Sequence, residues 1–157
     1  MVKKFPYSRQ KILKQDIVAV NKLLMSSYLT QVPAVKEFEN KVFTKVNVKY
    51  AVAVNSATSA LHISCLALGL KKNDLLWTVP TTFVASANCG VYCGADVDFV
   101  DIDEKTFNID VNKLSEKLKK SKRKPKILVT VHLGGQPTEQ EKVWKLDKTI
   151  ISPICLK

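Results

Sequence analysis

The sequence has no apolar run as long as the roughly 20 residues that a membrane-spanning helix needs. Its first six residues include two lysines, but no apolar stretch follows them, so we predict no secretory signal. A chain of 157 residues with 46% hydrophobic and 25% charged residues has the composition of an ordinary globular domain. We therefore expect a cytoplasmic protein without a membrane partner.

Metal-binding and disulfide patterns are also missing. The four cysteines, Cys65, Cys89, Cys93 and Cys155, form no Cys-x-x-Cys pair and have no histidine at zinc-site spacing. Three of them lie within apolar helical patterns, which favours small buried side chains over a disulfide framework. Asp101 and Asp103 bracket the end of a predicted strand, where we expect loop caps and solvated charges rather than a metal site.

Several catalytic templates are absent from a chain that holds only five glycines. There is no Gly-x-Ser-x-Gly elbow, no Gly-x-x-x-x-Gly-Lys phosphate loop and no Gly-x-Gly-x-x-Gly turn after a strand. Of the two histidines, His62 lies on a helical pattern and is expected to pack, whereas His132 follows a predicted strand. His132 is therefore the better functional candidate.

Acidic residues are few, and the net charge is +11. Much of it comes from one run, residues 117–126, which has no interleaved aromatic residue and no nucleic-acid module around it. We interpret this run as a solvated helix end and loop and expect no specific nucleic-acid partner. A nucleic-acid binder remains the least favoured of three hypotheses.

The hydrophobic periodicity predicts strands alternating with helices. Helical patterns cover residues 15–25, 33–45, 61–69, 83–92 and 111–118; strand patterns cover residues 50–55, 75–79, 97–101 and 127–131. Such alternation predicts an α/β fold with a mostly parallel sheet and helices on both faces.

Polar turns follow each predicted strand, at residues 55–59, 80–83, 101–103 and 132–137. The turn at residues 55–61 (NSATSAL) opens a helix, so its hydroxyl and amide groups either cap that helix or bind phosphate. Both interpretations are open from the local pattern. Because ligands of parallel sheets bind beyond the carboxyl ends of the strands, the four turns together favour a cofactor site.

Six ordered segments resemble one family. They are residues 5–10 (FPYSRQ), 28–31 (YLTQ), 53–61 (AVNSATSAL), 82–88 (TFVASAN), 99–103 (FVDID) and 131–137 (VHLGGQP). From about residue 4 to residue 144 the chain resembles the N-terminal part of the DegT/DnrJ/EryC1/StrS family of nucleotide-sugar aminotransferases, which use pyridoxal phosphate. The nearest subgroup aminates C4 of a UDP-linked 4-keto-6-deoxy-N-acetyl hexose on the route to pseudaminic acid.

The resemblance implies a truncated large domain of the aspartate-aminotransferase type (fold type I). It implies pyridoxal 5'-phosphate as cofactor, glutamate as amino donor, a UDP-4-keto-sugar as acceptor and, for the full-length family, a homodimer. The resemblance also implies three parts: an N-terminal helical arm at 1–48, a partial cofactor-binding domain at 49–144 and a divergent tail at 145–157.

Site residues follow from the same resemblance. Ala57, Thr58 and Ser59 match the phosphate-binding turn of the cofactor, and Phe83 matches the aromatic side chain that stacks on the pyridine ring. His132 and Gln136 fall in a loop beside the cofactor, without an assigned role. The residues that match the lining of the sugar-nucleotide pocket are Tyr7, Tyr28, Leu29 and Thr30.

The family's chemistry also needs a lysine that binds the cofactor covalently and an aspartate that holds the pyridine nitrogen protonated. In the family both lie beyond the matched segment, and we find neither motif here, so we expect no transamination from this chain alone. A truncated or frameshifted reading frame is our hypothesis for the tail. The alternative to an aminotransferase is a non-catalytic remnant or binding module that keeps the sugar-nucleotide and phosphate surfaces.

Overall fold

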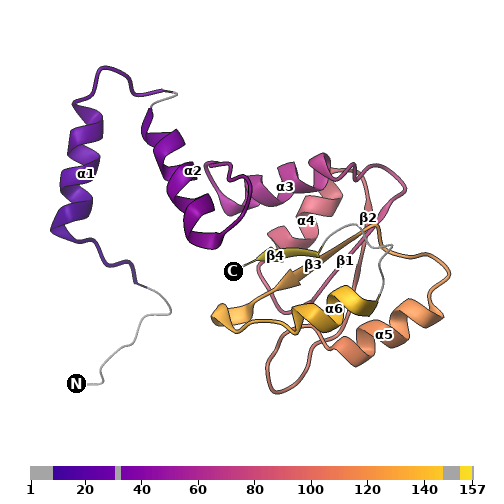
Figure 1. Ribbon diagram of the computed structural model, residues 1–157. Coiled ribbons are helices and arrows are strands. Elements are labelled where there is room, and N and C mark those ends of the chain that lie inside the picture. Colours follow the sequence, from indigo (N-terminus) through magenta and orange to yellow (C-terminus); the bar gives the residue numbers. More distant parts are fainter. Residues whose placement is uncertain (1–8, 31–32, 147–152, 157) are drawn as a thin grey trace, which may run out of the picture. The chain divides into compact units, whose positions relative to one another are not determined.

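The computed structural model describes residues 9–30, 33–146 and 153–156 (Figure 1). The chain forms two compact units, Met1–Ala53 and Val54–Lys157, which are considered separately below. No helix among the described residues is long and apolar enough to cross a membrane.

The first unit contains two helices, α1 (Lys14–Leu24) and α2 (Pro33–Val46). Asp16 accepts a hydrogen bond from the Leu13 N–H at 2.7 Å and thereby ties down the start of α1, and Pro33 begins α2 where its missing N–H costs nothing. Both helices agree with the predicted ranges to within about a residue. Neither helix has a buried residue.

The strand predicted at residues 50–55 is wrong. These residues have no strand assignment, although residues 50–54 form an apolar run of the length of a strand. A strand exists only when its backbone pairs with a neighbour, and the Ala53 N–H donates instead to the Glu39 side chain at 2.8 Å. Tyr50 and Val52 are exposed, so these side chains of the apolar run have no core to face within the described chain.

The second unit is built on a parallel sheet of four strands in the order β2-β1-β3-β4. The strands are β1 (Leu75–Thr78), β2 (Asp96–Phe99), β3 (Ile127–Val131) and β4 (Pro153–Leu156). Three of them match predicted strands, and the predicted α/β fold with a parallel sheet is confirmed. The sequence did not predict β4, which pairs with β3 from Leu128↔Pro153 to Val131↔Leu156.

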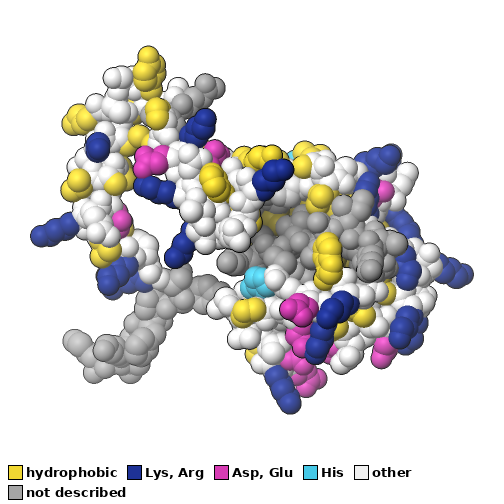
Figure 2. All heavy atoms as spheres, viewed as in Figure 1, with side chains coloured by type: hydrophobic (Ala, Val, Ile, Leu, Met, Phe, Trp, Pro, Cys, Tyr) yellow, Lys and Arg dark blue, Asp and Glu magenta, His cyan; other side chains and the backbone are white. Residues whose placement is uncertain are grey.

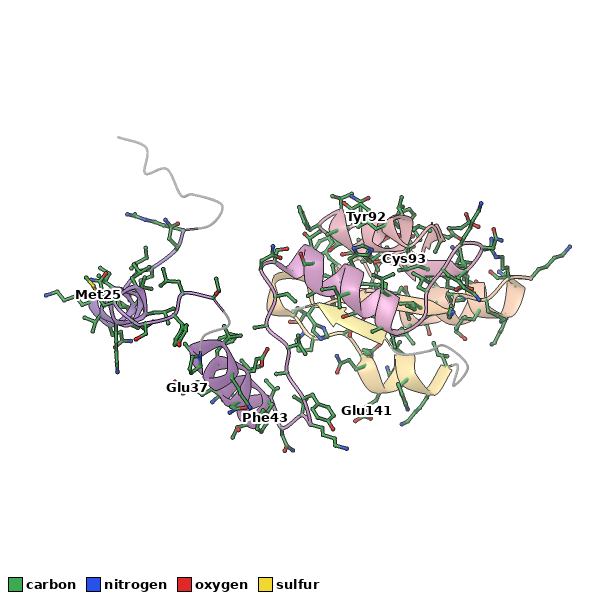
Figure 3. The ribbon with its side chains drawn as sticks, turned by 90° about the horizontal axis from the view of Figure 1, so that it is seen from above. Met25, Glu37, Phe43, Tyr92, Cys93 and Glu141 are labelled. Carbon is green, nitrogen blue, oxygen red and sulfur yellow. The ribbon has the colours of Figure 1, made fainter. Side chains whose placement is uncertain are left out.

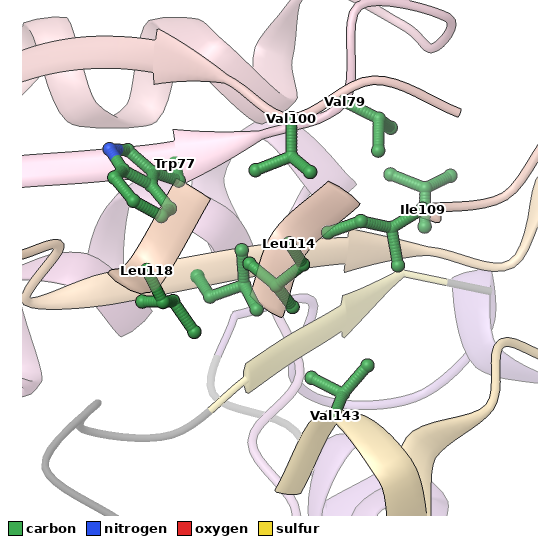
Figure 4. Packing of buried hydrophobic residues seen from close by; sticks show 9 residues of the cluster. Trp77, Val79, Val100, Ile109, Leu114, Leu118 and Val143 are labelled. Carbon is green, nitrogen blue, oxygen red and sulfur yellow. The ribbon is translucent and has the colours of Figure 1, made fainter. Parts of the chain in front are cut away.

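Helices cover both faces of this sheet (Figure 1). On one face lie α3 (Ala57–Ala67) and α4 (Ala85–Tyr92); on the other lie α5 (Val111–Lys120) and α6 (Gln140–Leu146). Neighbouring residues of β1 point to opposite sides, because Leu76 belongs to the core under α3 and α4 whereas Trp77 belongs to the core under α5 and α6. Figure 4 shows the second core, in which Trp77, Leu114 and Val143 are buried.

The last residues of the basic run, 123–126, lie near the amino ends of the strands, where they join elements together. Lys126 donates to the Gly69 carbonyl just after α3 and pairs with Asp74 at 2.8 Å. Lys124 donates to the Leu118 carbonyl near the end of α5, and Arg123 pairs with Asp96 at 2.6 Å. Cations near helix carboxyl ends stabilise the helix dipole, so the run has a structural use that its sequence did not reveal.

Candidate cofactor site at the carboxyl edge of the sheet

The turn before α3 caps the helix. Ser56 is the N-cap residue, and its hydroxyl oxygen accepts from the Ser59 N–H at 3.1 Å. The Ser59 hydroxyl donates to Asn55 Oδ1 at 2.7 Å and lies 3.0 Å from the Ser56 hydroxyl. The capping interpretation is therefore confirmed, with the turn closed by its own side chains.

Capping leaves part of this helix start open. The Ser59 N–H is used by the Ser56 hydroxyl, and the Ala60 N–H by the Ser56 carbonyl at 3.0 Å. Within the described chain, the N–H groups of Ala57 and Thr58 have no such partner, and neither has the Thr58 hydroxyl. Two backbone donors and one hydroxyl at the positive end of a helix dipole can receive an anion such as phosphate.

The helices α3 and α4 both begin toward the carboxyl edge of the sheet. Each packs on the sheet next to β1, and α3 ends beside Lys126, which is at the amino edge, so α3 starts at the opposite edge. Helix α4 follows β1 and therefore starts where β1 ends. Leu61 in α3 and Ala85 in α4 belong to one buried cluster, so both helix starts lie at this edge on the same face of the sheet. Phe83, just before α4, is 72% exposed and presents an open aromatic ring.

The loop after β3 holds His132, which the structure buries rather than exposes. His132 Nδ1 accepts from the Thr138 N–H at 3.0 Å, so the neutral ring carries its proton on Nε2. Gln140 Nε2 lies 3.0 Å from His132 Nε2, and with the ring proton on Nε2 the Gln140 amide, turned over by 180°, accepts this hydrogen bond through its oxygen. The His132 side chain thus stabilises its own loop through hydrogen bonds to Thr138 and Gln140. Gln136, in the same loop, is exposed.

Asn108 is a residue of this edge that the sequence analysis missed. Its side chain is buried, and its Nδ2 donates to the carbonyls of Gln136 at 2.9 Å and Pro137 at 3.3 Å. Its Oδ1 accepts from the Leu133 N–H at 3.0 Å. One amide therefore fixes the glycine-containing loop in which Gly134 and Gly135 have positive φ of 61° and 85°. In the sequence, the only signal for this loop-fixing role is that Asn108 lies two residues before Asp110, the N-cap of α5.

The acidic residues of the edge cap loops, as predicted, and one of them also forms an ion pair that was not predicted. Asp103 accepts from the Thr106 N–H at 2.8 Å and its hydroxyl at 3.0 Å, which lowers the pKa of Asp103. Asp101 pairs with Lys113 at 2.8 Å, and this hydrogen bond lowers the pKa of Asp101 and raises that of Lys113. Asp110 caps α5. No group of three or more potential metal ligands occurs within the described part of the chain.

The residues predicted to line a sugar-nucleotide pocket belong to the first unit. Tyr28, Leu29 and Thr30 follow α1 and are exposed, and the Ser26 hydroxyl donates to the Tyr28 carbonyl at 2.9 Å. Tyr7 lies outside the described residues. The structure therefore brings the phosphate turn, Phe83 and the His132 loop to one edge and leaves the sugar-nucleotide residues as a separate prediction.

Comparison with known proteins gives relatives of one kind. The model of the DegT/DnrJ/EryC1/StrS aminotransferase family matches residues 10–151, which reaches past residue 144 into the predicted tail. The UDP-4-amino-4,6-dideoxy-N-acetyl-beta-L-altrosamine transaminase of Campylobacter jejuni is 39% identical over 148 residues, which are 94% of this chain. The chain spans about 39% of that relative's length.

Solved structures share the fold. The PLP-form of the putative sugar aminotransferase Spr1654 from Streptococcus pneumoniae has a TM-score of 0.85 and 26% sequence identity. The match covers 93% of this chain and 36% of the Spr1654 chain. A GDP-4-keto-6-deoxymannose-3-dehydratase, solved with a trapped PLP-glutamate geminal diamine, has a TM-score of 0.82 and 27% sequence identity. The match covers 91% of this chain and 38% of the dehydratase chain. Pyridoxal phosphate, predicted as the family's cofactor, is confirmed by these relatives. The chain belongs to the DegT/DnrJ/EryC1/StrS aminotransferase family.

Proposed function

We propose that this chain supplies the cofactor-phosphate cradle of a nucleotide-sugar aminotransferase that works in the cytoplasm. In that enzyme an amino group passes from glutamate to the 4-keto carbon of a UDP-linked 4-keto-6-deoxy-N-acetyl hexose, on the route to pseudaminic acid. The observation that carries the proposal is the pair of open N–H donors at Ala57 and Thr58, at the same edge of the sheet as the exposed Phe83 ring. The identity to the altrosamine transaminase supports the choice of sugar.

The residues at this edge fit pyridoxal phosphate. A phosphate dianion needs several donors and a positive field, and the N–H groups of Ala57 and Thr58, the Thr58 hydroxyl and the α3 dipole supply them. The Ser59 hydroxyl would join them by releasing Asn55 Oδ1, which now accepts from it at 2.7 Å. Phe83 offers a flat apolar surface for a pyridine ring. When bound, the cofactor supplies an electron sink at the carbon that carries the amino group.

The other site residues have narrower proposed roles. Asn108 and His132 hold the loop at residues 133–137 in one conformation, which keeps the exposed Gln136 at the carboxyl edge. We assign contact with the sugar nucleotide to Tyr7, Tyr28, Leu29 and Thr30. The division into an arm at 1–48, a cofactor-binding part at 49–144 and a tail at 145–157 belongs to the same proposal.

These 157 residues alone are proposed to bind the cofactor without turning over. By resemblance, the lysine that holds the cofactor covalently and the aspartate at the pyridine nitrogen belong to parts of the relatives that this chain does not span. The alternative is a non-catalytic binding module, and it makes the same prediction for the phosphate turn. Covalent attachment of the cofactor to a lysine would distinguish an active enzyme from the inactive cofactor-binding chain and from the non-catalytic binding module.

A nucleic-acid function is less favoured. Lys117, Arg123, Lys124 and Lys126 in the basic run already contact acidic side chains or backbone carbonyls of this chain. Amines engaged in this way release few counterions from a phosphate backbone, so we expect a shallow salt dependence for any nucleic-acid binding.

Equilibrium dialysis of the chain against pyridoxal phosphate tests the proposed function. Because a hydrogen bond to a charged group is worth about 1.5–3 kcal/mol, Thr58→Val is expected to weaken binding about tenfold or more. Ser64→Ala, which removes a hydroxyl two turns further along α3, is the matched control and leaves the affinity unchanged. Equal affinities of the wild type and Thr58→Val for pyridoxal phosphate would contradict the proposed phosphate site at the start of α3.

Mass spectrometry after borohydride reduction tests the second half of the proposal. We expect the unmodified mass of the chain, because no lysine of this chain is proposed to bond to the cofactor. A cofactor adduct on a lysine would contradict the proposed absence of turnover. It would not contradict the proposed binding of phosphate at the start of α3.

A further inference from the structure

Three cysteines gather where α3 and α4 pack on the sheet. Cys65 of α3 is 0% exposed and Cys89 of α4 is 1% exposed, and both belong to the core under these two helices. Cys93, one helical turn after Cys89, packs against the same core and is only partly buried. Figure 3 shows Cys93 and Tyr92 at the end of α4, beside α3. The cofactor site proposed above uses none of these thiols.

The Cys65 and Cys89 thiols contact each other between the two helices. The Cys65 thiol donates a hydrogen bond to the Cys89 sulfur, and the Cys89 thiol donates in turn to the Ser86 carbonyl at 3.3 Å. The helices that carry these thiols are separated in the chain by β1, so the contact is a tertiary one. Two sulfur atoms that face each other across a packed boundary have the arrangement from which a disulfide can form.

This contact makes the two thiols chemically unequal. The hydrogen bond raises the pKa of Cys65, and it lowers the pKa of Cys89 because it stabilises the Cys89 thiolate. Burial raises the pKa of Cys93. Since the thiolate is the nucleophilic form of cysteine, Cys89 is the first of the three to react with a small electrophile that reaches the cluster.

The surroundings of the pair favour two thiols when no oxidant is present. Residues 51–70 and 75–95, which hold α3 and α4 entirely, contain no Asp, Glu, Lys or Arg. Figure 2 shows Lys and Arg side chains gathered on the side of α5 instead. The Cys89 thiolate is therefore stabilised mainly by the Cys65 thiol and not by a lysine or arginine of these segments. Under reducing conditions such a pair stays as a dithiol.

We propose that Cys65 and Cys89 are a redox-sensitive pair, which hydrogen peroxide oxidises to a disulfide that locks α3 to α4. The Cys89 thiolate attacks one peroxide oxygen, the O–O bond breaks, and Cys89 becomes a sulfenic acid while the other oxygen leaves as hydroxide. That hydroxide takes the proton of Cys65 and becomes water. The Cys65 thiolate then attacks the Cys89 sulfur and displaces hydroxide, which is protonated to a second water. The two thiols lose two electrons and the peroxide gains them.

The disulfide would fix α4 relative to α3. Cys89 lies about one turn from the start of α4, and Cys65 lies about two turns from the start of α3. A cross-link at this depth holds the two helices together on the sheet. It also closes the chain segment that contains β1, which restricts the unfolded chain and makes the oxidised protein more resistant to urea than the reduced protein.

Mass spectrometry of the peroxide-treated full chain tests the proposal. The reduced chain is treated with hydrogen peroxide, its remaining thiols are alkylated, and it is digested with trypsin. We expect a cross-link between the peptides 50–71 and 73–105, which dithiothreitol removes. The cross-link is expected to be lost in Cys65→Ala and in Cys89→Ala. The matched control, Cys93→Ala, keeps it, because Cys93 is not part of the pair.

Fragmentation of the wild-type cross-link locates the disulfide even where a variant fails to fold. A bond from Cys65 to Cys89, together with a higher urea midpoint of the oxidised chain, is the expected result. Thiols that stay unmodified, or a disulfide that includes Cys93, would overturn the proposal. So would the same yield of the Cys65–Cys89 bond, relative to the other pairings, when the chain is oxidised in urea, or an unchanged urea midpoint after oxidation.

Discussion

Asn108 joins two loops of the carboxyl edge through its side chain and its backbone. Its amide makes three hydrogen bonds to the backbone of the loop after β3, and its own carbonyl accepts from the Asp103 N–H at 2.9 Å. It therefore joins the loop after β2 to the loop after β3. A buried amide that loses these bonds leaves unpaired backbone groups behind.

Replacing this side chain is expected to be costly. Asn108→Ala removes three hydrogen bonds at a buried position and should lower the free energy of unfolding by about 2–3 kcal/mol, measured by urea denaturation. Asn112→Ala, at an exposed position on α5, is the control and should stay within about 0.5 kcal/mol of the wild type. A variant at Asn108 as stable as the control would show that the amide does not hold the loop.

The Asp74–Lys126 pair is expected to make stability depend on acid pH. Its hydrogen bond lowers the pKa of Asp74 from the ordinary 3.8, so the pair stabilises the fold above that value. This stability is lost as the pH falls through the lowered pKa in the folded state. We expect Asp74→Asn to reduce the melting temperature at pH 7 and to show a smaller difference at pH 3.

Calorimetry at the two pH values makes this comparison. Glu116→Gln breaks the exposed i,i+4 ion pair with Lys120. We expect it to change the melting temperature little at either pH, because both side chains of this pair are solvated. A difference for Asp74→Asn that grows on acidification would contradict the assigned direction of the pKa shift.

At the scale of elements, the helices and strands of the second unit could be predicted because each pattern has its packing partner within the chain. The apolar residues at 127–131 become the fully buried β3, and Gly69 and Gly94, with φ of 72° and 74°, end their helices as expected. The strand predicted at residues 50–55 failed because an apolar run favours a strand but does not supply the neighbouring strand with which its backbone must pair.

Gly90 shows why α4 can lie so close to the sheet. A Cβ at this position would come within 2.9 Å of Val97 Cγ2 and 3.2 Å of Leu76 Cβ. Gly90→Ala is therefore expected to destabilise the fold by about 1–3 kcal/mol, although alanine is the better helix former. Thermal unfolding measures the change.

Asn88→Ala is the companion variant for Gly90→Ala. It lies on the same helix without facing the sheet and should be neutral or slightly stabilising by helix propensity. A stabilising effect of Gly90→Ala would mean that α4 is free to move away from the strands.

At the scale of the whole molecule, the sequence predicted the family, the cofactor of the family and the parallel sheet. It could not predict the bracing of His132 or the contacts of the lysine run. His132 looked like an open catalytic group because a strand end is usually accessible, but its two ring nitrogens are engaged by Thr138 and Gln140. Such tertiary hydrogen bonds join residues whose pairing has no signal in the local pattern.

The central claim is that the start of α3 binds the phosphate of pyridoxal phosphate. An NMR titration of the ¹⁵N-labelled chain reports on the donors directly, because the open N–H groups of Ala57 and Thr58 would form hydrogen bonds to the phosphate. We predict that these two amide signals shift most, together with signals of the segment around Phe83. Largest shifts in residues 117–126, with Ala57 and Thr58 unmoved, would contradict the account.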